Sequence, residues 1–454
     1  MIQVFLALLI TVMVARLILK GYRAELVLFV AGFTLMVATQ LLGVGSILPK
    51  NVASTGLEAL DSFEFMRILF SSRAAELGLM IMALMGFAQY MDHIGANAAV
   101  VRVVTRPLQR MSSPYILLFF SYLFASGLQL AIGSATGLAV LLMGTMFPIM
   151  LGLGLSAASA AGVIATSLAI AYTPTAIDAI RGSQAVNMDV VEYVVYYQGP
   201  AALATVLVVG IAHIFWQRHC DKKANTLPSK ATMTSASDTG SAPGYYALLP
   251  MLPIIFAVGT SSLFVEGIKL HIVTIVLFCM AICLLVEMAR KRDFKQVCDG
   301  FNQFLSGMGV AFTTVVCLLV AAGVFAHGIK TIGAIEQLIA FSEHVGLPPF
   351  AMAVVFAVVT LAAAIIMGSG NAPFLAFVEL IPQIAASMGA NAIAMILPMQ
   401  QASHMGRAMS PVSGVVIAVA SGAKLAPFEV VKRTSVPLLI GFVFHTLVIG
   451  LFFY

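Results

Sequence analysis

The chain has 454 residues, of which 61% are apolar and only 9% are charged, and its mean hydropathy is +1.02. Soluble globular domains carry roughly 25% charged residues, so this composition excludes a soluble protein and predicts an all-α polytopic membrane protein. The net charge of +5 comes from basic residues scattered over short loops. That distribution does not favour nucleic-acid binding.

Apolar runs long enough to cross a bilayer follow one another along the chain. We expect spanning segments near 2–19, 25–43, 74–91, 157–186, 200–216, 247–260, 271–289, 305–327, 391–421 and 437–453. The first run lacks the basic start and the small-residue cleavage site of a signal peptide, so we expect it to be retained. The five cysteines show no paired metal-ligand spacing, which favours small buried hydrophobic residues.

Two further apolar stretches, 113–153 and 349–389, behave differently. Each is interrupted at its middle by a Gly- and Ser-rich sequence, IGSATG at 132–137 and MGSGNAP at 367–373. Two apolar arms around a polar break favour a re-entrant hairpin, because polar backbone at membrane depth survives only where protein or water covers it. Two full spans joined by a tight turn are the alternative.

Basic residues predict the orientation, because cytoplasmic loops carry an excess of Lys and Arg. If each hairpin returns to its own side, most basic residues fall on one side of the membrane. They form clusters at 16–23, 102–110, 218–230, 290–295 and 424–433. We therefore expect both termini in the periplasm, and the polar Ser/Thr-rich segment 219–246 as a flexible cytoplasmic linker.

The halves on either side of this linker, 1–218 and 247–454, resemble one another. GFAQYMDHIGA at 86–96 matches VFAHGIKTIGA at 324–334. Further matches follow at a nearly constant offset: Gly133 with Gly368, Pro174 with Pro411, Glu192 with Glu429 and Pro200 with Pro437. Five spans and one hairpin per half give an odd number of crossings, so we expect two inverted repeats. Inverted repeats with interrupted helices are a transporter architecture.

Polar breaks occupy corresponding places in the two hairpins and in two broken helices, 157–186 and 391–421. They are Gly133–Gly137, Thr173–Thr175, Gly368–Pro373 and Ser410–Ser413. We expect helix N-caps at Ser134 or Thr136, at Asn371, at Thr173 before Pro174 and at Ser410 before Pro411. Helix N-termini that face one region suit a carboxylate or phosphate. For any single break, a kink or a close-packing motif is the alternative.

Charged residues at membrane depth normally have a partner or a function. We expect Arg407 to grip a carboxylate with its planar guanidinium, whereas Arg181 either contacts the anion, pairs with Asp178 or lies near the outer interface. Asp178, Glu379 and His404 are candidates for proton coupling. Their alternatives are, respectively, an ion pair with Arg181, an interface position and a core hydrogen bond.

Several long motifs resemble those of the DcuC family of anaerobic C4-dicarboxylate carriers. They are GFAQYMDHIGAN, RPLQRMSSPY, SATGLAVLLM, GSGNAPFLAFVELIP, QASHMGRAMSPVSGVVIAVA and PFEVVKRTSVP. The resemblance implies a bacterial inner-membrane carrier of succinate, fumarate, malate and aspartate, working by succinate efflux or fumarate–succinate exchange. It also implies membership of the wider ion-transporter superfamily, with a homodimer whose scaffold domains hold moving, elevator-type transport domains.

In that superfamily's divalent-anion symporters, Ser-Asn-Thr at each hairpin tip touches the substrate carboxylate. The matching tips here are Ser134-Ala135-Thr136 and Ser369-Gly370-Asn371, without the central Asn. Together with the breaks and the arginines, they give the candidate substrate-binding residues. These are Ser134, Ala135, Thr136, Thr173, Thr175, Ser369, Gly370, Asn371, Arg407, Ser410, Ser413 and Arg181.

The sequence therefore predicts a secondary carrier of small dicarboxylates without a metal or organic cofactor. Proton symport or exchange is favoured over sodium coupling. A carrier or antiporter for another small organic anion on the same fold is the alternative. An intramembrane enzyme would need HExxH, a GxSxG-like nucleophile or a paired-Asp motif, none of which occurs, and the paired breaks disfavour a passive channel.

Overall fold

The computed structural model describes residues 2–20, 22–49, 52–105, 113–226, 242–260, 270–334 and 348–453. Within these ranges every regular element is a helix, and seven helices are long and apolar enough to cross a membrane. Shorter apolar helices occur at Pro114–Leu130, Ala157–Thr166, Gly244–Gly259 and Gly414–Ala423. The predicted all-helical, multi-pass fold class is thus confirmed.

The helices are named in chain order. The first half contains α1 (Ile2–Leu19), α2 (Ala24–Leu42), α3 (Glu58–Arg73), α4 (Leu79–His93), α5 (Ala96–Thr105), α6 (Pro114–Gly127), α7 (Ala135–Gly152), α8 (Ala157–Thr166), α9 (Ile177–Ala185), α10 (Val190–Glu192) and α11 (Gly199–Lys223). The second contains α12 (Leu252–Gly259), α13 (Ile272–Lys291), α14 (Phe294–Ala311), α15 (Cys317–Thr331), α17 (Pro349–Met367), α18 (Asn371–Val378), α19 (Ile381–Ser387), α20 (Ala392–Ala408), α21 (Gly414–Ala423) and α22 (Pro427–Phe453).

Short π- and 3₁₀-helical segments join some of these helices. The π segments are η1 (Ala74–Gly78), η4 (Tyr193–Gln198) and η6 (Phe312–Val316). The 3₁₀ segments are η3 (Leu128–Leu130) and η5 (Gly244–Met251). Element η1 joins α3 to α4, and η6 joins α14 to α15, so each of these pairs is one long helix with a π turn inside it.

Several helices extend beyond the apolar runs that predict them. Helix α3 precedes the expected span 74–91 and carries acidic residues in its first turn, which is why hydropathy does not reveal it. Helix α22 begins at Pro427, and the expected start at Pro437 lies inside the helix. Helix α11 continues to Lys223, so the first residues of the expected linker are helical. Most of that linker, 227–241, lies outside the described residues.

The two halves follow the same order of elements. In each, a long helix with a π turn (α3–η1–α4 and α14–η6–α15) precedes two apolar arms, a broken helix and a long final helix. The π turns themselves fall at matching positions, Ala74–Gly78 and Phe312–Val316. This correspondence agrees with an internal repeat, and the inverted orientation of the second half stays a prediction.

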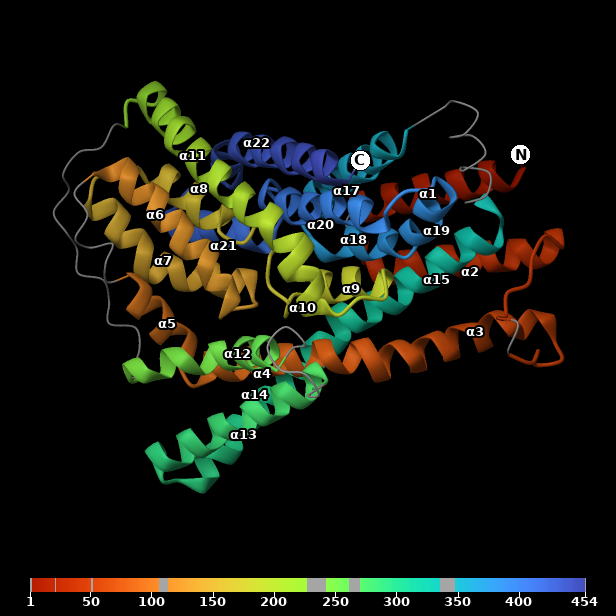
Figure 1. The fold of residues 1–454 in the computed structure, drawn as a ribbon, viewed down its shortest axis with the longest axis horizontal. Helices are drawn as coiled ribbons and strands as arrows, with labels where there is room; N and C mark the ends of the chain where they lie inside the picture. The colour runs from red at the N-terminus through yellow and green to blue at the C-terminus, as the bar shows by residue number, and fades with distance from the viewer. Residues whose placement is uncertain are drawn as a thin grey trace.

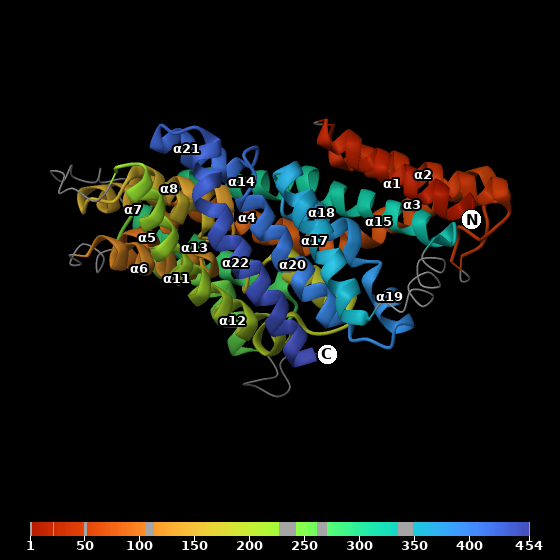
Figure 2. The same cartoon turned by 90° about the horizontal axis from the view of Figure 1, so that it is seen from above.

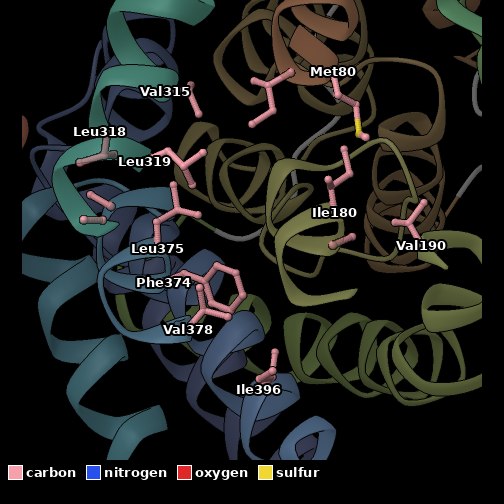
Figure 3. Packing of buried hydrophobic residues seen from close by; sticks show 14 of the residues in the cluster. Met80, Ile180, Val190, Val315, Leu318, Leu319, Phe374, Leu375, Val378 and Ile396 are labelled. Atoms are coloured by element: carbon pink, nitrogen blue, oxygen red, sulfur yellow. The ribbon is translucent and has the colours of Figure 1, made fainter. Parts of the chain in front are cut away.

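The halves are interlocked rather than separate. Figures 1 and 2 show α1 and α2 at one end of the molecule and α6, α7 and α8 at the other. The buried apolar residues form two large clusters, and each cluster draws residues from both halves. Helix α18 illustrates this mixing, since Phe374 and Leu375 pack near Leu318 of α15 and Ile180 of α9 (Figure 3).

Candidate functional site

A cavity of about 480 Å³ lies where both hairpin tips and both broken helices approach α4, η5, α12 and the η6–α15 helix. Its volume falls within the usual range for small-molecule sites. Most of the predicted site residues line it. They are Ser134, Ala135, Thr136, Thr173, Thr175, Asp178, Ser369, Gly370, Asn371, His404 and Arg407. Arg181, Glu379, Ser410 and Ser413 are not among the lining residues.

Each hairpin tip places a serine hydroxyl at the start of a helix. The Ser134 Oγ accepts a hydrogen bond from the Gly137 amide at 3.1 Å, which confirms Ser134 as the N-cap of α7. In the second hairpin the Ser369 Oγ accepts from the Ala372 amide at 3.4 Å. The expected cap at Asn371 is wrong, because Asn371 is already the first helical residue of α18.

The two broken helices resume one turn later than their prolines suggest. Thr173-Pro174 and Ser410-Pro411 each open a four-residue turn, closed by Ala176 N to Thr173 O at 3.2 Å and by Ser413 N to Ser410 O at 3.3 Å. Proline fits the second position of such a turn. The expected caps at Thr173 and Ser410 are therefore wrong.

The helices that follow these turns are α9 and α21. Helix α9 starts at Ile177 after Ala176, which offers no side-chain cap, whereas the Ser413 Oγ caps α21 by accepting from the Val416 amide at 3.2 Å. The Thr173 and Thr175 hydroxyls lie 2.9 Å apart and bond to one another. Ser413 thus has a structural role beneath the cavity wall.

Three glutamine side chains form hydrogen bonds with the irregular backbone between α8 and α9, just before the Thr173–Thr175 break. Gln401 brackets Ala171, accepting from its amide at 3.0 Å and donating to its carbonyl at 2.6 Å. Gln198 donates to the same carbonyl, and Gln129 donates to the Ile170 carbonyl, both at 3.0 Å. These amides supply the partners that polar backbone needs inside a membrane. The motif reading of the sequence missed them, although a Gln inside an apolar span is a usable signal.

The two arginines at membrane depth have different surroundings. Arg407 lines the cavity. Its Nη2 donates at 2.8 Å to the carbonyl of Leu168, which lies in the irregular segment between α8 and α9. No ion pair within the described ranges includes Arg407. Arg181 instead forms an ion pair with Glu379. The cavity therefore has a guanidinium that no described carboxylate contacts directly.

The predicted pairing of Arg181 with Asp178 is wrong. Asp178 faces α20, where its Oδ2 accepts from the Gln400 Nε2 at 2.6 Å and lies 3.0 Å from the His404 Nε2. Residues three apart on α9 contact different neighbours here: Asp178 reaches α20, and Arg181 reaches the end of α18. His404 consequently has a carboxylate beside it at the edge of the cavity.

Glu379 lies in a cluster of ion pairs and not in the cavity wall, while the interface position considered for it stays a prediction. Its carboxylate is bound by Arg181 and by the Nη2 of Arg73, the latter at 2.9 Å. The Glu379 side chain is 17% exposed and that of Arg181 is 6% exposed. This cluster joins the last residue of α3 to α9 and α18, so it ties together helices that lie behind the cavity.

Removing the Glu379 carboxylate is expected to destabilise the fold. A Glu379→Gln variant leaves the buried Arg181 without a counter-ion, which lowers the free energy of unfolding by about 3 kcal/mol. Thermal unfolding of the detergent-purified protein measures the change. The surface Arg67–Glu64 pair supplies the control, because Glu64→Gln is expected to leave the unfolding midpoint nearly unchanged. Equal unfolding midpoints for the two variants would contradict the role given to Glu379.

Within the described residues, no group of three or more His, Cys, Asp or Glu side chains is gathered as a metal site. The polar lining of the cavity consists of hydroxyls, side-chain amides, helix N-termini, the His404–Asp178 pair, Asp92 and Arg407. Such a set of donors suits a small organic anion.

Comparison with known proteins identifies the family. The family model for DcuC, described as a C4-dicarboxylate anaerobic carrier, matches residues 2–454. The anaerobic C4-dicarboxylate transporter DcuC of Escherichia coli K12 is 45% identical over 442 residues, covering 97% of this chain and 95% of that protein. The probable anaerobic C4-dicarboxylate transporter DcuC of Vibrio cholerae is 43% identical over 451 residues, covering 99% and 97%.

Two solved structures share the fold. MtrF of Neisseria gonorrhoeae, described as illuminating a class of antimetabolite efflux pumps, aligns with a TM-score of 0.64 at 13% identity, covering 95% of this chain and 96% of that one. The YdaH transporter of Alcanivorax borkumensis aligns with a TM-score of 0.56 at 14% identity, covering 95% and 99%. At these identities the likeness concerns the fold alone. The sequence matches carry the assignment, and the chain belongs to the DcuC family, whose members are transporters and not enzymes.

Proposed function

We propose that the protein is a secondary active transporter of C4-dicarboxylates in the bacterial inner membrane. The observation that carries this proposal is Arg407, a cation that forms no ion pair within the described part of the chain and lines a cavity shared by both hairpin tips. Succinate, fumarate, malate and aspartate each carry two carboxylates on a short chain. The family membership and the names of the similar proteins support this substrate class.

A dicarboxylate would be held at both of its ends. One carboxylate would accept hydrogen bonds from the Arg407 guanidinium, which offers a planar pair of donors. The other would lie at the hairpin tips, near the N-termini of α7 and α18, where unpaired amides and the helix dipole favour negative charge. The Ser134 and Ser369 hydroxyls lie at these tips.

We also propose an elevator-like mechanism in two inverted repeats. The moving part would comprise the hairpins, 113–153 and 349–389, and the broken helices, 157–186 and 391–421. Helices α4, α12 and α15 would belong to the static scaffold, since they contribute the opposite wall of the cavity. Periplasmic termini and a homodimer complete the proposal, by the basic-residue pattern and by resemblance to the superfamily, respectively.

Coupling to protons, or exchange without an ion, is proposed in preference to sodium. The His404–Asp178 pair, whose side chains lie within 3.0 Å, is the proton-bearing candidate at the cavity. Histidine changes charge near physiological pH. Glu379 stands apart from the cavity in its cluster of arginines, which makes it the weaker candidate.

Uptake of labelled succinate into proteoliposomes tests the proposal. We expect saturable uptake that is driven by an imposed proton gradient or by internal fumarate, is competed by fumarate and malate, and does not respond to a sodium gradient. Empty liposomes are the control. Absence of saturable flux with every four-carbon diacid would overturn the substrate assignment, and flux of another organic acid alone would favour the alternative carrier.

A further inference from the structure

One acidic side chain of the cavity, Asp92, opposes the anion chemistry of the proposed site. It belongs to α4, whose cavity-lining positions recur at helical spacing. These positions are Ile81, Leu84, Met85, Phe87, Ala88, Gln89 and Asp92, and most of them mark one face of the helix. The Asp92 side chain is exposed, in contrast to the buried neighbour Met91. The carboxylate therefore lies at the end of a stripe that faces the cavity.

The geometry brings this carboxylate to the helix N-terminus of the first hairpin. Its Oδ2 lies 3.8 Å from the point that a Cβ on Gly137 would occupy. Gly137 is in the first turn of α7, and its own amide is capped by Ser134. The two preceding residues of α7 carry the N–H groups that have no carbonyl partner within the helix. Asp92 thus lies beside the first turn of α7, the turn whose free N–H groups are proposed to receive a substrate carboxylate.

Asp92 forms no ion pair with a described residue of the cavity wall. The other titratable groups in the cavity wall are Arg407, His404 and Asp178, and of these the two last pair with one another. The hydrogen bond found for the Asp92 carboxylate is from the Asn97 Nδ2, and no ion pair in the described part of the chain includes it. The N-terminus of α7, whose dipole favours negative charge, then supplies the positive partial charge beside this carboxylate.

We infer that Asp92 is a tethered competitor of the substrate. In the substrate-free carrier its carboxylate lies by the α7 N-terminus, and a dicarboxylate must displace it to bind there. This inference rests on the proposed function, since it assigns to a scaffold-side residue a part in substrate affinity. A competitor of this kind raises the apparent dissociation constant to the intrinsic constant divided by the fraction of carriers whose site is open.

Comparison of the two repeats does not predict a role for Asp92. The position that matches Asp92 in the second half is Lys330, so the two halves differ there in the sign of their charge. An aspartate near the end of an apolar run also resembles an ordinary interface residue. Only the helical phase of α4 and its approach to Gly137 place Asp92 in the cavity.

Neutralising Asp92 is expected to tighten substrate binding. We expect Asp92→Asn, which keeps the shape of the side chain, to lower the KM for succinate roughly 5-fold or more. We expect Asp92→Glu, which carries the charge one CH₂ further towards α7, to raise the KM. Both are measured in proteoliposomes, with Glu64→Gln on the exposed face of α3 as the matched acid-neutralising control.

The split between kinetic constants separates competition from a structural role. A structural role for Asp92 predicts a lower maximal rate with KM unchanged or higher, whereas competition predicts a lower KM in Asp92→Asn. An unchanged or higher KM in Asp92→Asn, or a lower KM in Asp92→Glu, would overturn the inference. If Asp92→Asn does not yield folded protein, the Asp92→Glu measurement decides alone.

Transport by the wild-type protein distinguishes a failure of the proposed function from a failure of the competitor role of Asp92. If the wild-type protein transports no four-carbon diacid, the proposed function fails, whatever the variants do. If the wild type transports succinate and the Asp92 variants share its KM, the proposed function stands and only the competitor role is lost.

Discussion

Replacing Arg407 with glutamine is expected to raise the KM for succinate roughly 10- to 100-fold. The guanidinium lines the cavity and forms no ion pair with any described residue, so donors other than the Nη2 group bonded to Leu168 can reach a substrate carboxylate. A hydrogen bond to a charged group contributes about 1.5–3 kcal/mol, and each 1.4 kcal/mol is a factor of about ten in affinity. The measurement is the concentration dependence of succinate uptake into proteoliposomes.

Two control variants make the Arg407 result specific. Arg407→Lys keeps the positive charge but loses the planar fork, so we expect an intermediate KM if two-point recognition matters. Arg67→Gln removes an arginine that lies exposed on α3 and pairs with Glu64, and it is expected to leave KM unchanged. A KM for Arg407→Gln equal to that of wild type would remove Arg407 from the binding site.

Adding a single methyl group at Gly368 is expected to abolish transport and lower the free energy of unfolding by about 3 kcal/mol. Gly368 ends α17 with φ at +66°, a conformation that costs other residues about 1–2 kcal/mol. A Cβ there would also lie only 2.9–3.0 Å from the backbone of Val412 and Ser413, and such overpacking costs about 1–3 kcal/mol more. The clash would push the second hairpin tip away from the turn before α21.

The first hairpin supplies the matched control for Gly368→Ala. Gly133 is the repeat partner of Gly368, yet a Cβ at Gly133 would have nothing within 4 Å and its φ is not in the left-handed region. Gly133→Ala is therefore expected to unfold at the wild-type temperature. Thermal unfolding in detergent compares the two variants, and equal midpoints would show that the close packing at Gly368 does not constrain the fold.

The sequence predicts the position of the site better than its internal contacts. Gly, Ser and Pro interrupt apolar runs at matching places, and three of the four interruptions line one cavity. The fourth, Ser410–Ser413, is followed by Gly414 and Val415, which line it. Irregular backbone needs shelter inside a membrane. The same patterns place the caps of the broken helices one turn too early, since Thr173-Pro174 and Ser410-Pro411 can open either a helix or a turn. Spacing alone does not choose between these two uses of proline.

Partner choice depends on packing between segments that are distant in the chain. Asp178 and Arg181 have the right spacing for a pair on one helix, but Gln400 and Glu379 meet them first. Asp92 reaches the cavity through the phase of α4. Both outcomes depend on how α9 and α4 are rotated against their neighbours, which a single sequence does not specify.

The interlocked halves also bear on how the protein is assembled. Gln401 belongs to the second half, yet it satisfies both backbone groups of Ala171 in the first. Until α20 has been synthesised and inserted, the Ala171 amide lacks its partner and the carbonyl has only Gln198. An unpaired amide is costly in lipid. We therefore expect the Ala171 peptide to stay accessible to water, or covered by the insertion machinery, until nearly nine-tenths of the chain has been translated. Biogenesis of this carrier is consequently a late event, completed by the closing of the second half over the first.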